Sequence, residues 1–250
     1  MDKIRILNVD ILNITLKQLL ERLHEGVVVT PNVTHMLLAQ NDREFYHAYQ
    51  IADWVICDSR VLQLFSKLLP KPIIEAIPGS SFFTEFYHYH RNDPNCRIFI
   101  LGGKEGVAQK ALKNINREIG HQIVVGAHSP SFHIDDEETK EIAKIINESG
   151  ATIVLTGLGA PKQEKFIIKA KSLMPGVKVW MALGATVDFE ASTLKRAPMV
   201  WRKYRLEWLY RFIQEPRRLF RRYFIIDIKF FWYFGKQLMG IYKNPFEKQK

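Results

Sequence analysis

The segment Gly157–Glu164 carries the most chemically suggestive residues in the chain. It runs Gly-Leu-Gly-Ala-Pro-Lys-Gln-Glu, so two glycines and a proline precede the first turn of a predicted helix. Because N–H groups at a helix N-terminus bind anions, Gly159, Lys162 and Gln163 are candidate substrate-binding residues. A solvated helix start would explain Lys162 and Glu164, but it would not explain the glycine spacing before them.

Asp58 stands directly after the apolar run Asp53–Cys57 and directly before a predicted helix. It can be the N-cap of that helix. It can also be a general base, as a partly desolvated carboxylate within reach of an acceptor hydroxyl. Thr30 and Asn32 flank the turn after the run Gly26–Thr30, where they can hydrogen-bond a sugar or serve turn and cap chemistry. We take Asp58 as the candidate catalytic residue and the other two as candidate sugar ligands.

The sequence lacks the common motifs of cofactor and metal binding. Gly102 and Gly103 precede a predicted helix, where their N–H groups could bind a phosphate or simply form a tight turn. The sequence has neither a G-x-G-x-x-G fingerprint at this point nor a P-loop motif, which disfavours nicotinamide, flavin and P-loop enzymes. The histidines form no convincing ligand pair, Cys57 and Cys96 lack C-x-x-C spacing, and no Asp-x-Asp occurs. We therefore expect no cofactor and no metal site, so cationic side chains and helix N-termini would have to stabilise a leaving diphosphate.

Six short apolar runs alternate with amphipathic segments over the first 190 residues. Continuous β-branched runs are typical of parallel strands covered on both faces, and the alternation predicts a Rossmann-like, doubly wound, mainly parallel α/β sheet. Ligands of such sheets bind beyond the carboxyl ends of the strands, where the candidate residues stand. The predicted strands are 26–30, 53–57, 97–101, 122–125, 151–156 and 177–182. The predicted helices are 15–24, which opens with a capping box at Thr15 and Gln18, 32–50, 59–69, 81–90, 106–119, 136–149 and 161–172.

The composition divides the chain into two parts. Its 250 residues are 47% hydrophobic and 25% charged, as in ordinary globular proteins. Two cysteines exclude a disulfide framework, and we expect neither a secretory signal after Met1 nor a membrane span. Of the net charge of +10, residues 195–250 carry +11, with 15 of the 36 Lys and Arg, and they also hold 15 of the 30 aromatic residues. This predicts a catalytic domain over 1–194 and a basic, aromatic helical appendage over 195–250.

Eight motifs follow one another along the chain: Thr30–Asn32, Cys57–Ser59, Phe99–Gly103, Gly157–Glu164, Gly184–Phe189, Lys195–Pro198, Leu206–Arg211 and Gln214–Leu219. In this order they resemble the WecG/TagA/CpsF glycosyltransferase family, from about residue 8 to about residue 225. The resemblance implies an inverting, UDP-sugar-dependent hexosyltransferase whose acceptor is an undecaprenyl-diphosphate-linked saccharide. It also implies a cytoplasmic enzyme, peripheral on the inner face of the cell membrane, that builds teichoic-acid linkage units, exopolysaccharide or related polymers; homo-oligomerisation is left open.

The resemblance also implies roles for single residues. Asp58 falls where the family's proposed base lies, and would remove the proton of the acceptor hydroxyl as that oxygen attacks C1. Ala76 falls where the family often has an arginine, so a donor other than N-acetylmannosamine comes into question. Thr30, Asn32 and Gln163 fall on sugar-site positions and Asp188 on a nucleotide contact. The departing UDP would meet the glycine-rich turns and the tail arginines Arg211, Arg218 and Arg221.

Two other functions stay open on the sequence alone. The basic tail would suit a nucleic-acid-binding protein, and a UDP-sugar-modifying enzyme would need no lipid acceptor. On a helix over residues 217–228, however, four arginines share one face and apolar residues the opposite one. Such a helix suits an anionic bilayer surface, or packs on the core with its basic side solvated. The body has no RNA-binding or helix-turn-helix signature, which favours a membrane partner and no nucleic acid.

Changing Arg218 and Arg222 to Glu is expected to weaken binding to anionic vesicles and to slow transfer to a membrane-embedded acceptor, because both charges lie on the predicted basic face. Vesicle cosedimentation and UDP release measure the two effects. Unchanged binding and transfer would mean that the basic face is only the solvated side of a packed helix.

Overall fold

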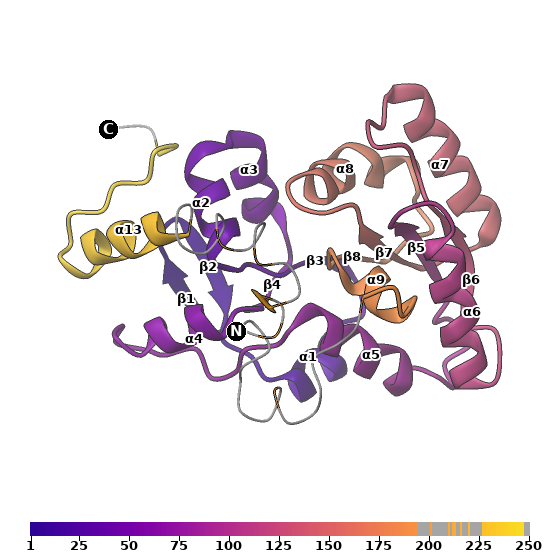
Figure 1. The fold of residues 1–250 in the computed structure, drawn as a ribbon, viewed down its shortest axis with the longest axis horizontal. Helices are drawn as coiled ribbons and strands as arrows, with labels where there is room; N and C mark the ends of the chain where they lie inside the picture. The colour runs from indigo at the N-terminus through magenta and orange to yellow at the C-terminus, as the bar shows by residue number, and fades with distance from the viewer. Residues whose placement is uncertain are drawn as a thin grey trace.

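The computed structural model describes residues 1–194 and 227–247, together with the single residues 201, 210, 212, 213, 216 and 220. Its centre is a six-stranded sheet in the order β4-β3-β8-β7-β5-β6, with every pairing parallel (Figure 1). The predicted α/β sheet is confirmed, and each predicted strand is present. The strands are β3 (Gly26–Val29), β4 (Trp54–Val55), β5 (Ile98–Gly102), β6 (Val124–His128), β7 (Ile153–Gly157) and β8 (Val179–Ala182).

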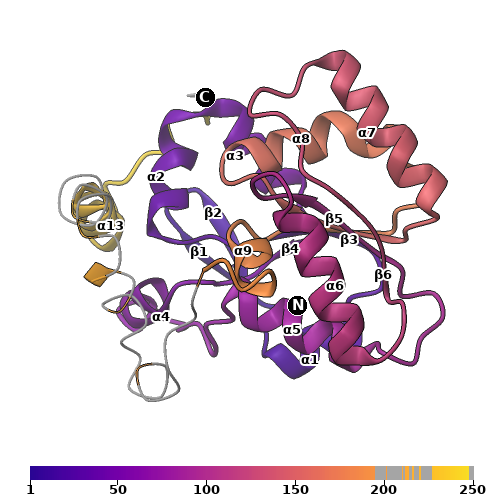
Figure 2. The same ribbon diagram turned by 45° about the vertical axis from the view of Figure 1, so that its right-hand side comes forward.

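Helices cover both faces of this sheet because the strand residues alternate between two hydrophobic clusters. In β3, Val27 and Val29 belong to one cluster and Val28 to the other. Burial on both sides explains why the strand sequences are continuous apolar runs. The first face carries α2 (Val33–Asn41), α3 (Arg43–Ile51), α7 (Asp136–Ser149) and α8 (Lys162–Ala170). The second carries α1 (Leu16–Arg22), α5 (Gly79–Tyr89), α6 (Val107–Ile119) and α9 (Thr186–Glu190), of which α6 and α9 lie side by side in Figures 1 and 2.

Local sequence signals account for several helix ends. The capping box at Thr15 is confirmed, since its side chain accepts the N–H of Gln18 and the Gln18 side chain accepts the N–H of Thr15. Asp135 caps α7, and the helix ends at Gly150 in the left-handed conformation that glycine favours. Helix α4 (Arg60–Ser66) follows β4, and a short 3₁₀ helix, η1 (Lys171–Leu173), follows α8. Cys57 and Cys96 are buried free thiols, as the absence of a disulfide framework predicts.

The segment predicted as one helix over 32–50 is two helices, and Asp42 separates them. Asp42 has extended dihedrals, φ −122° and ψ 107°, and its carboxylate accepts the N–H of Phe45, so it ends α2 and caps α3. Lys165 of α8 forms a 2.8 Å ion pair with the same carboxylate. The amphipathic pattern continues through the break, which is why periodicity alone did not reveal it.

An antiparallel hairpin of β1 (Lys3–Ile6) and β2 (Val9–Leu12) lies outside the main sheet and was not predicted. Its turn contains Leu7 with φ 52°, a conformation usually taken by glycine or asparagine, so the usual glycine signal of a hairpin is missing. The N–H of Leu7 donates to Oε1 of Gln237, 2.7 Å away and 230 residues later in the chain. The hairpin turn is therefore held by a tertiary contact.

That contact comes from α13 (Ile228–Leu238), which lies beside α2 and the hairpin (Figures 1 and 2). Phe230 and Phe234 are buried in the first hydrophobic cluster. Ahead of the helix, Asp227 accepts a 2.9 Å hydrogen bond from the hydroxyl of Thr34. The C-terminal part of the chain thus contributes side chains to the same core as the body.

Most of residues 195–226 lie outside the described residues, and so does most of the predicted helix over 217–228. The division at residue 194 into a catalytic domain and an appendage therefore stays a prediction. Within the described ranges, no helix combines the length and the apolar character needed to cross a bilayer.

Replacing Phe230 with Ala is expected to lower the free energy of unfolding by about 3–5 kcal/mol, because the ring is fully buried and its loss leaves a cavity. Trp232 on the same helix is 66% exposed, so Trp232→Ala serves as control with a loss under about 1 kcal/mol. Urea denaturation of both variants measures the difference. Equal losses would contradict the packing of α13 on the body.

Candidate active site

Strands β3 and β8 are hydrogen-bonded neighbours, yet α2 and α9, which follow them, pack on opposite faces of the sheet. In open α/β sheets, ligands bind beyond the carboxyl ends of the strands at such a reversal, and we refer to this region as the crevice. Thr30, which follows β3, is buried there, and its hydroxyl donates to the carbonyl oxygen of Ala182 at 3.5 Å. Asn32 is the N-cap of α2, its Oδ1 accepting the N–H of His35. Both predicted sugar ligands thus lie at the edge where ligands bind.

The carboxylate of Asp58 lies at the same edge and does not cap α4. The cap of α4 is Ser59, whose Oγ accepts the N–H of Leu62. Oδ1 of Asp58 instead accepts the N–H of Gly79, the first residue of α5, at 2.9 Å. A Cβ on Gly79 would lie 3.7 Å from Oγ1 of Thr30. Gly79 therefore lies next to both Asp58 and Thr30, the residue that follows β3.

Gln163 connects the turn after β7 to the turn after β8. Its side chain is buried, and its Oε1 accepts the N–H of Gly184 at 3.0 Å. Leu183, the preceding residue, lies close to Gly79, because a Cβ on Gly79 would be 3.2 Å from its Cδ2. The segment Ala182–Gly184 thus contacts Thr30, Gly79 and Gln163. These contacts bring Thr30, Asp58 and Gln163 together around one turn.

The glycines at the ends of β5 and β7 have a packing reason. A Cβ on Gly102 would approach the backbone of Gly157 to 2.5 Å, and a Cβ on Gly157 would approach the Val187 side chain to 2.4 Å. The N–H of Gly103 donates to the carbonyl of Gly157 at 3.3 Å. The tight-turn interpretation therefore accounts for these glycines, and phosphate binding by Gly102 and Gly103 stays a prediction.

The remaining predicted site residues in the described ranges lie around this centre. The Lys162 ammonium contacts the loop before α7, donating to the carbonyl of Phe132 at 2.9 Å and lying over its ring. The carbonyl of Gly159 accepts the N–H of Gln163 at 3.0 Å. Asp188 belongs to α9, and its backbone carbonyl accepts the N–H groups of residues 193 and 194.

The tail arginines Arg211, Arg218 and Arg221 lie outside the described residues, so their predicted contacts with the diphosphate stay predictions. Among the described residues, no three His, Cys, Asp or Glu side chains form a group that could hold a metal ion.

A buried polar network beneath the crevice was not predicted. The hydroxyl of Tyr49 lies 2.8 Å from Nδ1 of His35, on the helix that Asn32 caps. Burial raises the pKa of Tyr49 well above 10, and the charges of Glu164 and Asp58 raise it further. The hydroxyl therefore keeps its proton, and the tautomer of His35 decides which of the two groups donates.

Glu164 is the second buried member of this network. Its side chain is 1% exposed, its Oε1 accepts Nε2 of Gln163 at 2.9 Å, and its Oε2 has no hydrogen-bond partner in the described part of the chain. Burial raises its pKa from 4.5 to about 7. The interpretation of Glu164 as part of a solvated helix start is wrong. Its spacing of three residues from buried Ile167 is the signal that could have shown this.

Glu164→Gln is expected to flatten the pH dependence of stability. A folded-state pKa above the unfolded value means that the folded protein loses stability as the pH rises from 4.5 through about 7. The shift corresponds to about 3 kcal/mol. The variant should therefore gain stability over the wild type by up to this amount between pH 4.5 and pH 8, as measured by urea denaturation. A difference that does not change with pH would contradict an ionisable, buried Glu164.

One comparison with known proteins bears on this arrangement. The sequence model of the Glycosyl transferase WecG/TagA/CpsF family matches residues 4–244 of the 250-residue chain. The match spans the whole sheet, the crevice between β3 and β8, and α13. The chain therefore belongs to the WecG/TagA/CpsF family of glycosyltransferases.

Proposed function

We propose that this glycosyltransferase moves a hexose-type sugar from a UDP-sugar to an undecaprenyl-diphosphate-linked saccharide, with inversion at C1. Family membership implies a transferase of cell-envelope polysaccharide synthesis with a sugar donor and an acceptor. The identities of the donor and the acceptor, and the inversion at C1, are proposed from the motifs in the sequence. The observation that carries it furthest is the carboxylate of Asp58, held at the crevice by the N–H of Gly79.

In the proposed reaction the acceptor hydroxyl oxygen attacks C1 of the donor sugar, and the bond from C1 to the diphosphate oxygen breaks. The hydroxyl proton passes to the Asp58 carboxylate, and UDP leaves with the bonding electron pair. One-step displacement inverts the configuration at C1. The hydrogen bond from Gly79 fixes one carboxylate oxygen, which orients the base before the acceptor arrives.

The neighbouring residues have supporting roles in this proposal. Thr30 and Asn32 would contact the donor sugar from the β3 side and Gln163 from the β7 side. Asp188 would contact the nucleotide. The growing negative charge on UDP would be stabilised by the N-terminal ends of α6 and α8, which begin at the same edge of the sheet, and by Arg211, Arg218 and Arg221.

The proposed partners include the membrane surface where a polyprenyl-linked acceptor resides. The charge of +11 over residues 195–250 supports an encounter with anionic lipid. The enzyme would then work at the inner face of the cell membrane as a peripheral protein.

Asp58→Asn is expected to lower the transfer rate by about a hundredfold or more, because the amide keeps the shape of the side chain but cannot accept the proton. The assay is UDP release from a panel of UDP-hexoses with a short polyprenyl-diphosphate saccharide as acceptor. Asp93→Asn, in an exposed loop, is the matched control and should keep the wild-type rate.

Two outcomes would contradict the proposal. A folded Asp58→Asn protein with more than about a tenth of the wild-type rate would remove Asp58 from the role of base. Full turnover of UDP-sugar in the absence of any lipid acceptor would instead indicate a UDP-sugar-modifying enzyme.

A further inference from the structure

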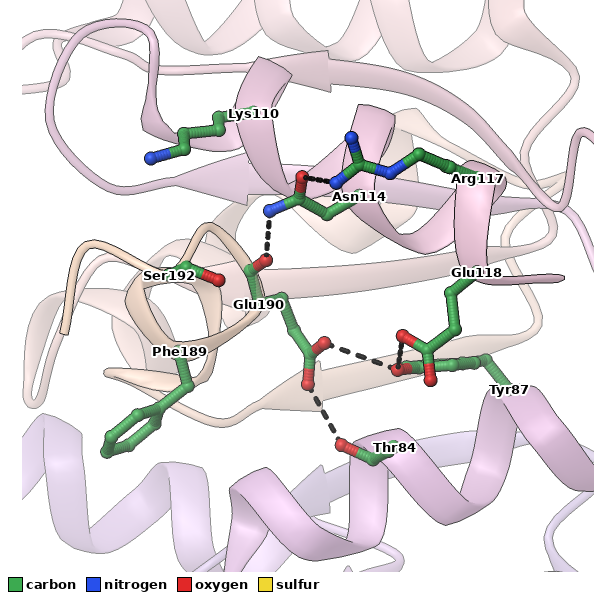
Figure 3. Close-up of a pocket in the computed structure, with 9 residues that line it drawn as sticks. All are labelled: Thr84, Tyr87, Lys110, Asn114, Arg117, Glu118, Phe189, Glu190 and Ser192. Atoms are coloured by element: carbon green, nitrogen blue, oxygen red, sulfur yellow. Dashed lines mark hydrogen bonds between the residues drawn. The ribbon is translucent and has the colours of Figure 1, made fainter. Parts of the chain in front are cut away.

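A cleft of about 580 Å³ opens between α5, α6 and α9 (Figure 3). Its lining contains none of the candidate site residues named above. Its volume falls within the range of small-molecule sites. The side chains that matter here are Thr84 and Tyr87 from α5, Lys110, Arg117 and Glu118 from α6, and Glu190 from α9. All six carry hydrogen-bonding groups, which suit a polar ligand.

One end of the cleft holds two carboxylates around one phenol. The hydroxyl of Tyr87 lies 3.3 Å from a carboxylate oxygen of Glu118 and 3.3 Å from one of Glu190. Burial and these two charges raise the pKa of Tyr87, so the hydroxyl stays protonated. It has one proton, which can serve one carboxylate at a time. Thr84 donates a second hydrogen bond to Glu190 at 2.9 Å, and Nε2 of His88 pairs with Glu118 at 2.9 Å. Each carboxylate oxygen can accept two hydrogen bonds, so Glu118 keeps acceptor capacity for the hydroxyl groups of a ligand.

The cations lie along α6, at Lys110 and, about two turns further along, at Arg117 (Figure 3). Arg117 donates to Oδ1 of Asn114, whose amide in turn donates to the backbone carbonyl of Glu190 at 2.8 Å. Cations and carboxylates thus stand side by side among the described lining residues. A polyol, whose hydroxyl groups both donate and accept hydrogen bonds, can use such a mixed lining.

The cleft is close to the proposed base along α5. Gly79, whose N–H holds Asp58, begins this helix, and Thr84 follows five residues later. At the rise of an α-helix this separation is about 7.5 Å along the axis. The cleft thus begins within two helical turns of the residue that holds Asp58.

We propose that the cleft between α5, α6 and α9 is a carbohydrate subsite that binds the saccharide of the acceptor. This inference rests on the proposed function for the identity of its ligand. Sugar hydroxyls would donate to the carboxylate of Glu118 and accept from the ammonium of Lys110.

The test measures binding by the full-length protein without turnover, by isothermal titration. The probes are farnesyl-diphosphate-linked N-acetylglucosamine, farnesyl diphosphate without sugar, and UDP. Glu118→Gln and Lys110→Ala are expected to raise the Kd of the sugar-bearing probe about tenfold each. The Kd values of farnesyl diphosphate and UDP should stay within twofold of wild type.

Two neighbours outside the lining supply matched controls: Glu85 on α5 and Lys113 on α6, both exposed. Glu85→Gln and Lys113→Ala should bind all three probes as the wild type does. Equal affinity of all variants for the sugar-bearing probe would overturn the inference, as would a loss of UDP affinity instead. A wild type that binds the probe but never transfers sugar to it would reject the proposed function while leaving the subsite standing.

Discussion

The arrangement of the described site depends on the segment Ala182–Gly184, which is the end of β8 and the turn that follows it. Its backbone receives a hydrogen bond from the hydroxyl of Thr30 and gives one to the buried side chain of Gln163. Leu183 packs beside Gly79, whose N–H in turn fixes Asp58. Since α2 and α9 follow their strands toward opposite faces of the sheet, the turn lies at a reversal, and the side chains of Thr30 and Gln163 satisfy its polar backbone groups. The same residues that satisfy the turn therefore come to line the crevice.

Charge buried beneath the crevice has a cost that packing elsewhere must offset. Glu164 is almost fully buried with one carboxylate oxygen lacking a partner among the described residues, and its pKa is raised to about 7. Its other oxygen accepts from Gln163, and Gln163 holds Gly184. The orientation of the turn after β8 is thus coupled to a carboxylate that changes its protonation near neutral pH. A local conflict of this kind, next to a candidate site, is typical of functional rather than purely structural regions.

The C-terminal helix α13 constrains the segment that precedes it. Phe230 and Phe234 are buried in the core of the body, and Gln237 holds the β1–β2 turn. The described chain stops after α9 at residue 194 and resumes at Asp227, which accepts a hydrogen bond from Thr34 of α2. The two described ends next to residues 195–226 thus adjoin α9 and α2, the helices that flank the crevice.

The sequence by itself determined the sheet, because strands buried on both faces must be continuous apolar runs and these are visible without a structure. It also determined the helix ends with local caps, such as those at Thr15 and Asp135, and the family. The sheet edge at which the candidate site residues gather could be predicted as well, because these residues directly follow the strands. Only the tertiary structure decided the break at Asp42, since the apolar pattern is continuous across it and the ion pair with Lys165 comes from a distant helix. It decided the hairpin turn at Leu7, which Gln237 holds, and the burial of Glu164, which the charge of the side chain argues against. It also decided that Asp58 binds Gly79 and leaves the cap to Ser59. Each of these depends on residues far apart in the chain, whose contacts no local propensity encodes.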